Sequence, residues 1–398
     1  MPLALLALAL GAFGIGTTEF VIAGLLPELA ADFGTSIPVA GLLVSGYALG
    51  VVIGAPLVTA AGARLPRKTM LVGLMILFVA AHFLSALAPS YGALMTGRVI
   101  ASFAHGAYIG LGAVVAADLV RPERRASAIA LMFMGLSLSN VLGVPLGTFV
   151  GQHFGWRATF WVVTAIGVAA LIGIAALVPR GERPRTGLRH ELAAFRSGQV
   201  WLALAMTALG WAPVLGVVTY VAPLLTEVTG YSGAAVPWVM VLLGVGMLVG
   251  GPIGGRYADR ALMPSVYALL AALIAVSAVL LLAAHNRVTV VIALTVFGVV
   301  ASATIPPLQT RVLDKAAGAQ ALASAANVAA FNLGNTVGPF LAGLAISAGF
   351  GFTSPLWVAA LLGTAGLAVA LLSGALERSP VPENSDADAR DVRIQFRA

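Results

Sequence analysis

The sequence predicts an all-α membrane protein in which twelve transmembrane helices form two six-helix bundles related by an internal repeat. Three observations lead to this fold class: the composition, the spacing of apolar runs and the recurrence of short motifs in both halves. Of the 398 residues, 60% are hydrophobic and only 9% are charged. Soluble domains carry about 25% charged residues and about 45–50% apolar ones. The composition therefore excludes a soluble enzyme and a soluble nucleic-acid-binding protein.

The apolar runs have the length that a membrane crossing needs. A helix that crosses ~30 Å of hydrocarbon uses about 20 apolar residues. The first run is too long for the apolar core of a signal peptide, and no Lys or Arg precedes Arg64, so we interpret it as the first span. The twelve expected spans are 4–27, 39–61, 69–88, 91–116, 126–150, 158–178, 200–224, 236–256, 264–284, 288–310, 321–348 and 354–376.

The basic residues lie almost entirely on one side of these spans. The even-numbered connections and the C-terminal segment hold 19 Lys and Arg, whereas the opposite loops hold two, Arg157 and Arg287. An excess of Lys and Arg marks the cytoplasmic side of a membrane protein. Both termini are therefore expected to be cytoplasmic. The basic residues of these cytoplasmic loops also explain the net charge of +7, so no nucleic-acid partner is needed to account for it.

The longest polar interruption, near the middle of the chain, divides the protein into two halves. We expect an N-terminal bundle over 1–178, a cytoplasmic linker over 179–199, a C-terminal bundle over 200–376 and a disordered cytoplasmic tail over 377–398. AGLLPEL at 23–29 matches APLLTEV at 222–228, and LSNVLG at 138–143 matches LGNTVG at 333–338. Parallel six-span repeats around a central site are typical of transporters.

Two formal charges lie well inside the expected spans. Glu19 and Arg98 are placed at similar depth, so an interaction is available if the first and fourth spans are neighbours. A charge inside the membrane is costly and suggests a function, here the uptake and release of a proton by Glu19. The alternative is a static ion pair that fixes helix packing. His105, two turns after Arg98, is either a proton relay or a neutral packing residue.

Polar and aromatic side chains inside the spans are candidates for substrate binding. Asn327, Asn332 and Asn335 share one helix face, and such a face either lines a cavity or joins helices by hydrogen bonds. Aromatic rings could enclose a drug-sized apolar ligand, although most of them pack against other helices. The candidates are Phe20, Phe103, Tyr108, Asn140, Trp211, Tyr220, Gln309, Asn332 and Asn335.

Two stretches carry a resemblance to a known family. LMTGRVIASFAHGAYIG at 94–110 and GLSLSNVLGVPLG at 135–147 are similar to motifs of the major facilitator superfamily, in its twelve-span drug:proton antiporter group. The resemblance implies a role in proton coupling for Arg98. It also implies export, through the antiporter motif residues Gly135, Gly143, Pro145 and Gly147. Independently of the family, the prolines of 305–309 should interrupt the tenth span.

The family's cytoplasmic gate motif, Gly-x-x-x-Asp-Arg-x-Gly-Arg-Lys, is incomplete between the second and third spans. Thr59, Ala63 and Pro66 replace its Gly, Asp and second Gly. The copy between the eighth and ninth spans keeps its Gly, Asp and Arg, so we expect the gate to rest mainly on the second half. The gate residues implied are Arg64, Arg67, Lys68, Gly255, Asp259 and Arg260.

Three further stretches resemble the bacterial branch that contains chloramphenicol-resistance exporters and sugar-efflux relatives. They are TTEFVIAGLLPELA at 17–30, VTYVAPLLTE at 218–227 and IPPLQTRVL at 305–313. The resemblance implies a proton-coupled exporter of a chloramphenicol-like drug in the bacterial inner membrane. The alternatives are export of a sugar or metabolite and, less favoured, a membrane enzyme or sensor.

The expected partners follow from this hypothesis. We expect a monomer whose partners are a small-molecule substrate, protons and the lipid bilayer, with no nucleic acid. The chain has no cysteine, and its histidines share no ligand spacing, so we expect no metal site. No cofactor is expected either, because the proton gradient would supply the driving force.

Overall fold

The computed structural model describes residues 3–62, 65–121, 125–179, 195–316 and 320–378. Within these ranges twelve helices are long and apolar enough to cross a membrane, and no strand occurs. The predicted all-α fold class is confirmed. Most of the expected linker and nearly all of the expected tail lie outside the described residues, so those two assignments stay predictions.

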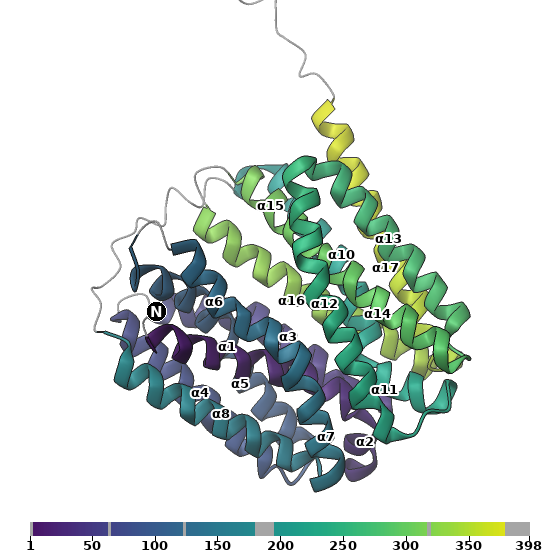
Figure 1. Ribbon diagram of the computed structural model, residues 1–398, viewed down its shortest axis with the longest axis horizontal. Helices are drawn as coiled ribbons and strands as arrows, with labels where there is room; N and C mark the ends of the chain where they lie inside the picture. The colour runs from purple at the N-terminus through teal and green to yellow at the C-terminus, as the bar shows by residue number, and fades with distance from the viewer. Residues whose placement is uncertain (1–2, 63–64, 122–124, 180–194, 317–319, 379–398) are drawn as a thin grey trace, which may run out of the picture.

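The N-terminal bundle is built from the first six of these helices, drawn in purple to blue in Figure 1. A short helix, α2 (Leu26–Phe33), lies between the first and second spans. The fifth span contains a π-helical turn, Ser139–Gly143, between its two segments. The spanning helices are α1 (Leu3–Val21), α3 (Ile37–Gly62), α4 (Arg67–Ala86), α5 (Tyr91–Asp118), α6 (Arg125–Leu138) with α7 (Val144–Phe154), and α8 (Trp156–Leu177).

The C-terminal bundle repeats this plan with α10 (Gly198–Thr219), α12 (Val236–Arg260), α13 (Leu262–Ala283), α14 (Arg287–Ala303) with α15 (Ile305–Lys315), α16 (Gln320–Ala345) and α17 (Ser354–Arg378). A short helix, α11 (Val221–Pro223), follows α10. The break between α14 and α15 confirms the predicted interruption. Pro306 and Pro307 occupy the start of α15, where their missing N–H groups cost no helical hydrogen bond.

The internal repeat is visible in how helices pack within each bundle. A Cβ atom added to Gly135 would lie 2.1 Å from the carbonyl oxygen of Ala9, and one added to Gly334 would lie 2.6 Å from that of Ala208. Gly334 follows Gly135 by 199 residues, and Ala208 follows Ala9 by the same 199 residues. The fifth span therefore packs on the first as the eleventh packs on the seventh.

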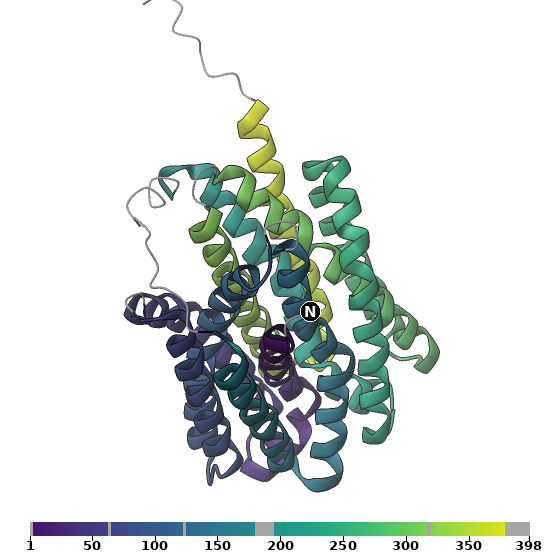
Figure 2. The same cartoon turned by 60° about the vertical axis from the view of Figure 1, so that its left-hand side comes forward.

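The two bundles converge at one end of the molecule and separate toward the other, as Figures 1 and 2 show. We call the end where α1 begins, and where Arg67 and Arg260 lie, the basic end, and the opposite end the far end. At the far end, a Cβ added to Gly41 of α3 would lie 2.4 Å from the hydroxyl oxygen of Tyr220, which follows α10. Close contact between the bundles thus joins them at the far end.

Arg157 and Arg287, the two basic residues of the odd-numbered loops, also stabilise the far end. Arg157 donates from Nη1 to Asp32 of α2 at 3.0 Å and from Nη2 to the carbonyl of Ala88 at 3.0 Å. Arg287 donates to the carbonyl of Gly230 at 2.5 Å. These bonds fix connections between helices at the far end, one in each bundle.

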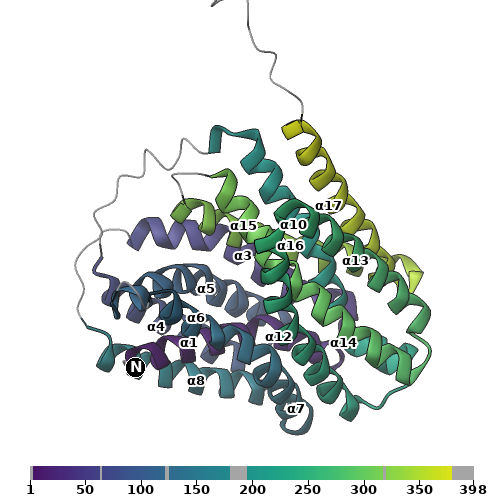
Figure 3. The ribbon, with the colours of Figure 1, turned by 45° about the horizontal axis from the view of Figure 1, so that its top comes forward.

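The outer faces of both bundles expose large apolar side chains. Exposed leucine, isoleucine and tryptophan are expected where helices face lipid rather than water. Examples from α8, α12, α13 and α14 are Ile172, Trp238, Leu282 and Ile292. Figure 3, which brings the top of the molecule forward, shows α13, α14 and α17 along the outer side of the C-terminal bundle.

Candidate functional site

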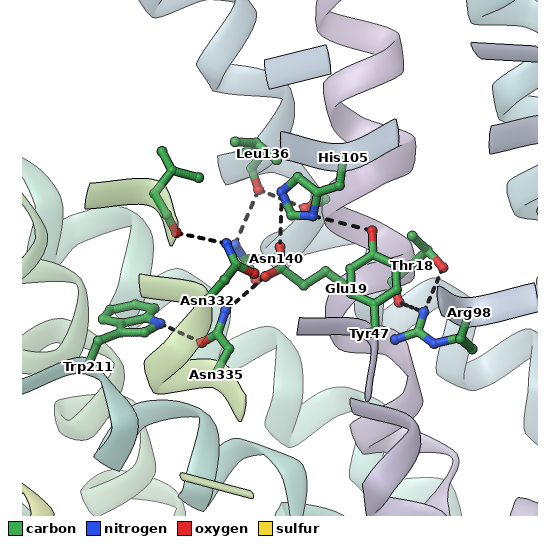
Figure 4. A network of polar contacts seen from close by, with 12 residues as sticks. Thr18, Glu19, Tyr47, Arg98, His105, Leu136, Asn140, Trp211, Asn332 and Asn335 are labelled. Carbon is green, nitrogen blue, oxygen red and sulfur yellow. Dashed lines mark hydrogen bonds and ion pairs between the residues drawn. The ribbon is translucent and has the colours of Figure 1, made fainter. Parts of the chain in front are cut away.

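Glu19 lies near the end of α1, buried between the two bundles, and is only 8% exposed. Its Oε1 accepts a hydrogen bond of 3.0 Å from Nδ2 of Asn335, which belongs to α16 of the C-terminal bundle. Its Oε2 lies 3.9 Å from Nε2 of His105, which belongs to α5 of the N-terminal bundle. Figure 4 shows the carboxyl group between these two side chains. One carboxyl group therefore has partners in both halves of the protein.

Arg98 is fully buried, and it binds the residue before Glu19. Its Nη1 donates to the backbone carbonyl of Thr18 at 2.6 Å and to the Thr18 hydroxyl at 3.0 Å. Its guanidinium lies over the ring of Tyr47, 4.2 Å from the centroid, in a cation–π contact. Within the described residues Arg98 has no hydrogen bond or ion pair with the Glu19 carboxyl. The interaction expected from the sequence is therefore indirect.

A histidine that the sequence did not single out completes the arginine's surroundings. Nδ1 of His82 lies 2.7 Å from the carbonyl of Phe78, and its Nε2 lies 2.7 Å from the Thr18 hydroxyl. A carbonyl only accepts, so Nδ1 carries the proton in a neutral ring and Nε2 accepts from Thr18. The hydroxyl oxygen is then free to accept from Arg98. This series of hydrogen bonds holds the end of α1 against α4 and α5.

His105 contacts Tyr47 on the other side of the carboxyl group. The Tyr47 hydroxyl lies 3.3 Å from Nδ1 of His105. When this hydroxyl donates, the neutral ring presents its Nε2–H to Glu19. The 3.9 Å separation is longer than a hydrogen bond, so the contact is electrostatic in this arrangement. The N-terminal bundle thus contains a small polar cluster, formed by Thr18, Glu19, Tyr47, Arg98 and His105.

Asn335 and Trp211, both expected to bind substrate, lie beside Glu19, and their role in substrate binding stays a prediction. The indole Nε1 of Trp211 donates to Oδ1 of Asn335 at 2.7 Å. The Trp211 ring meets Phe331 edge to face, with 5.4 Å between centroids. The asparagine is buried, and its two polar atoms are both engaged, one within its own bundle and one across the interface. Sequence spacing placed Asn335 on a polar face but did not show that Glu19 is its partner.

Two other predicted asparagines lie close to this group along their helices, as Figure 4 shows. Nδ2 of Asn332 donates to the Val328 carbonyl at 3.0 Å, and Nδ2 of Asn140 donates to the Leu136 carbonyl at 3.2 Å. Because carbonyls only accept, the amide orientation of both is fixed. Within the described residues Oδ1 of Asn332 is buried without a hydrogen-bond partner.

Phe20 and Asn140 line a small cavity between the bundles. Val214 and Met240 close it from the C-terminal side, and its volume is about 20 Å³. That volume is enough for about one water molecule, whereas pockets for drug-sized ligands occupy roughly 300–1,000 Å³. A substrate at this position therefore requires the bundles to move apart.

Two of the predicted aromatic residues lie away from Glu19. Tyr108 is buried inside the N-terminal bundle, where its hydroxyl donates to the Leu8 carbonyl at 3.0 Å. Tyr220 lies at the far end and donates to the Pro339 carbonyl at 3.1 Å. The structure gives both rings a packing position, and their role in substrate binding stays a prediction.

Phe103 and Gln309 also lie apart from the carboxyl group. Phe103 fits against Gly54 of α3, where an added Cβ would lie 2.1 Å from the ring. Gln309 of α15 accepts from Asn327 at 2.6 Å and donates to Ser324 at 3.2 Å, within the C-terminal bundle. The predicted asparagine face therefore divides: Asn335 bonds to Glu19, and Asn327 bonds to Gln309.

The three antiporter-motif glycines all face α1, the helix that carries Glu19. A Cβ added to Gly135, Gly143 or Gly147 would come within 2.1, 2.1 or 2.7 Å of an atom of α1. Pro145 follows the π-helical turn at the start of α7. The motif therefore lets the fifth span lie directly against the first. The atoms met are Ala9 O, Thr17 Oγ1 and Val21 Cγ2.

The predicted gate residues lie at the basic end. Arg67 pairs with Asp118 inside the N-terminal bundle, and Lys68 is partly buried. Arg64 lies outside the described residues. Asp259 and Arg260 are exposed, and no ion pair occurs for them within the described residues. A Cβ atom added to Gly255 would meet open space. The ion pair thus occurs in the first half, and the gate role of these residues stays a prediction.

One buried charge escaped the sequence reasoning. Arg311 of α15 is 2% exposed and donates to Glu377 at 2.7 Å and to Ser373 at 2.9 Å. The apolar run of the tenth span was expected to end at 310, so Arg311 was counted as a loop residue. Its location one residue beyond a proline-containing apolar run was the available signal.

Comparison with known proteins identifies the family. The sequence model described as the Major Facilitator Superfamily matches residues 8–326. The chain belongs to the major facilitator superfamily. It is 41% identical over 377 residues to the inner membrane transport protein YdhP of Escherichia coli (strain K12), covering 94% of this chain and 96% of YdhP. It is 35% identical over 395 residues to a chloramphenicol resistance protein of Streptomyces lividans, covering 98% of this chain and 100% of that protein.

A solved structure has the same fold. The crystal structure of a bacterial homolog of the human lysosomal transporter Spinster, in an inward-facing and occupied conformation, matches with a TM-score of 0.75 and 17% identity over 95% of this chain and 98% of that one. The protein is therefore a major facilitator transporter and not an enzyme. Its relatives and the twelve apolar helices among the described residues identify it as a multi-pass protein of the bacterial inner membrane.

Proposed function

We propose that this protein is a proton-coupled exporter of small, largely apolar drugs, with chloramphenicol as the first substrate to test. The observation that carries the proposal is the position of Glu19, whose carboxyl group has partners from both bundles. The similarity to a chloramphenicol resistance protein over nearly the whole chain supports the substrate class. In this proposal the transporter works as a monomer, because one chain supplies both bundles, and it needs no cofactor, because the proton gradient supplies the driving force.

The mechanism is alternating access between the two bundles. The basic end faces the cytoplasm, in keeping with the 19 Lys and Arg of the even-numbered connections and C-terminal segment. With that orientation, bundles joined at the far end correspond to an inward-facing form. When the bundles rock about the central site, Glu19 exchanges its proton with one side of the membrane at a time, and substrate leaves in the opposite direction.

Accumulation of labelled chloramphenicol tests this proposal in cells that lack their own efflux pumps. Expression of the protein should lower accumulation, and a protonophore should restore it. Glu227→Gln is the matched control, because Glu227 is an exposed carboxyl group at the far end. That variant should export normally. Unchanged accumulation with the protein present in the membrane would rule out chloramphenicol export, and export that ignores the protonophore would rule out proton coupling.

Export of a sugar or other hydroxyl-rich metabolite is the second candidate. The observation that favours it is that the buried amide oxygens of Asn327 and Asn332 have no donor among the described residues. Unpaired buried acceptors are costly, and hydroxyl groups of a substrate would satisfy them. Export rates of labelled sugars and of labelled chloramphenicol decide between the two candidates. If the protein exports a sugar faster than chloramphenicol, and Asn332→Leu removes that export, the metabolite is the substrate.

A further inference from the structure

Asn335 is held in one orientation by the residue behind it. The indole of Trp211 can only donate, so the amide oxygen of Asn335 must face it, at 2.7 Å. Nδ2 then faces Oε1 of Glu19 at 3.0 Å. A flipped amide would point its NH₂ at the indole N–H and its oxygen at the carboxyl oxygen, so both contacts would become repulsive. Asn335 is therefore a fixed donor directed at Glu19.

We propose that Asn335, oriented by Trp211, transmits the protonation state of Glu19 to the C-terminal bundle. This inference rests on the proposed function of Glu19 as the proton site. A hydrogen bond to a carboxylate is roughly twice as strong as one to a neutral acceptor. The anion of Glu19 therefore holds α16 against α1, and a proton on the carboxyl group weakens that hold. Asn335 and Trp211 act as positioning residues, since neither carries the proton.

The other ionisable groups around Glu19 belong to its own bundle. Arg98 and His105 face it from α5, Tyr47 faces it from α3, and His82 of α4 reaches it only through Thr18. These groups move with α1, because they belong to the same bundle. Among the described residues, Asn335 supplies the hydrogen bond that joins Glu19 to the opposite bundle. The effect of Asn335 on bundle position should therefore depend on the charge of Glu19.

The natural chain has no cysteine, which allows this to be measured directly. Spin labels on Thr69→Cys and Ala261→Cys mark the basic ends of the two bundles, and both positions are exposed. Their distance distribution by double electron–electron resonance, in lipid nanodiscs over a range of pH, reports how the bundles are placed. Asn335→Leu should change the populations severalfold at alkaline pH and little at acidic pH. Trp211→Phe, which retains a ring against Phe331, should act in the same direction but more weakly.

Controls separate this role from a purely structural one. Trp201, on the same helix as Trp211, donates its indole N–H to the Phe195 carbonyl, so Trp201→Phe should leave the distances unchanged. In a Glu19→Gln background the effect of Asn335→Leu should no longer depend on pH.

The outcomes distinguish this inference from the proposed function. If the wild-type distances do not respond to pH, proton coupling through Glu19 is wrong. If they do respond, and Asn335→Leu shifts the populations equally at every pH, only the role assigned to Asn335 is overturned.

Discussion

Arg98 donates to the backbone carbonyl of Thr18 at 2.6 Å, one residue before Glu19 in the chain. Thr18 lies in the last turn of α1, which ends at Val21. A buried cation from α5 therefore binds the last turn of the helix that carries Glu19. The carboxyl group is left to bond across the interface with Asn335. A direct ion pair would have tied Glu19 to its own bundle.

Arg98→Lys should impair both stability and transport. A lysine ammonium can approach the Thr18 carbonyl, but it cannot also present a planar group to the Tyr47 ring. We expect a loss of about 2 kcal/mol, the value for a cation–π contact away from water. Thermal unfolding in detergent measures the loss. Arg260→Lys, at an exposed position, is the control and should unfold like the wild type. An unchanged unfolding temperature for Arg98→Lys would contradict the stabilising role given to the contacts of Arg98 with Thr18 and Tyr47.

Glu19→Gln should separate substrate binding from proton coupling. The glutamine keeps an oxygen that can accept from Asn335, but it cannot take up a proton. In proteoliposomes we expect at least a tenfold loss of efflux driven by a pH gradient, because a coupled cycle needs the exchangeable proton. Downhill exchange of labelled for unlabelled substrate should continue. Retention of gradient-driven efflux would show that the proton site lies elsewhere.

The fold followed from the sequence because membrane crossing constrains composition strongly. Apolar length located twelve helices, and Pro306 and Pro307 located the break in the tenth span. The short matches between the halves indicated an internal repeat, and the equivalent packing of Gly135 and Gly334 agrees with it. These features are local or periodic, and each can be inferred without knowing how the helices are rotated.

The site followed only in part, because partners in it come from helices far apart in the chain. Glu19 and Arg98 stood out as charges inside apolar spans, whereas Thr18 and Tyr47 carry no charge and gave no signal. Asn335 was expected on a polar face, but its bond to Glu19 joins residues 316 positions apart. Such a pairing depends on helix rotation and on the relative placement of the bundles, and neither is specified by apolar periodicity.

Gly135→Ala should destabilise the N-terminal bundle by overpacking. The added methyl group would lie 2.1 Å from the Ala9 carbonyl oxygen, which belongs to backbone and cannot rotate away. We expect a cost of about 1–3 kcal/mol together with reduced transport. Gly334→Ala, its equivalent in the second half, should cost a similar amount because the contact there is 2.6 Å. Gly73→Ala has open space and should be neutral or stabilising by up to about 1 kcal/mol. Equal unfolding temperatures for the three variants would contradict this packing argument.

Asp32 should make the far end sensitive to acid. The indole of Trp156 donates to Asp32 at 3.0 Å, and this bond, together with Arg157, holds the pKa of Asp32 below its usual value. A carboxyl group with a lowered pKa in the folded state stabilises the fold at pH values above its unfolded pKa, which is about 4 for aspartate. This stabilisation is lost as the pH falls through the folded pKa. The contribution is small because the Asp32 side chain is 42% exposed, so water screens its charge.

Asp32→Asn therefore tests a pH dependence of known sign. Unfolding temperatures of the wild type and of this variant should differ at about pH 6 and converge as the pH falls through the lowered pKa of folded Asp32, because a protonated Asp32 no longer accepts as a carboxylate from Trp156 and Arg157. Trp156→Phe removes the indole donor and should raise the pKa of Asp32 toward its usual value, measurable by NMR titration of labelled aspartate. A gap between wild type and Asp32→Asn that widens as the pH falls would give the opposite sign and refute the assignment.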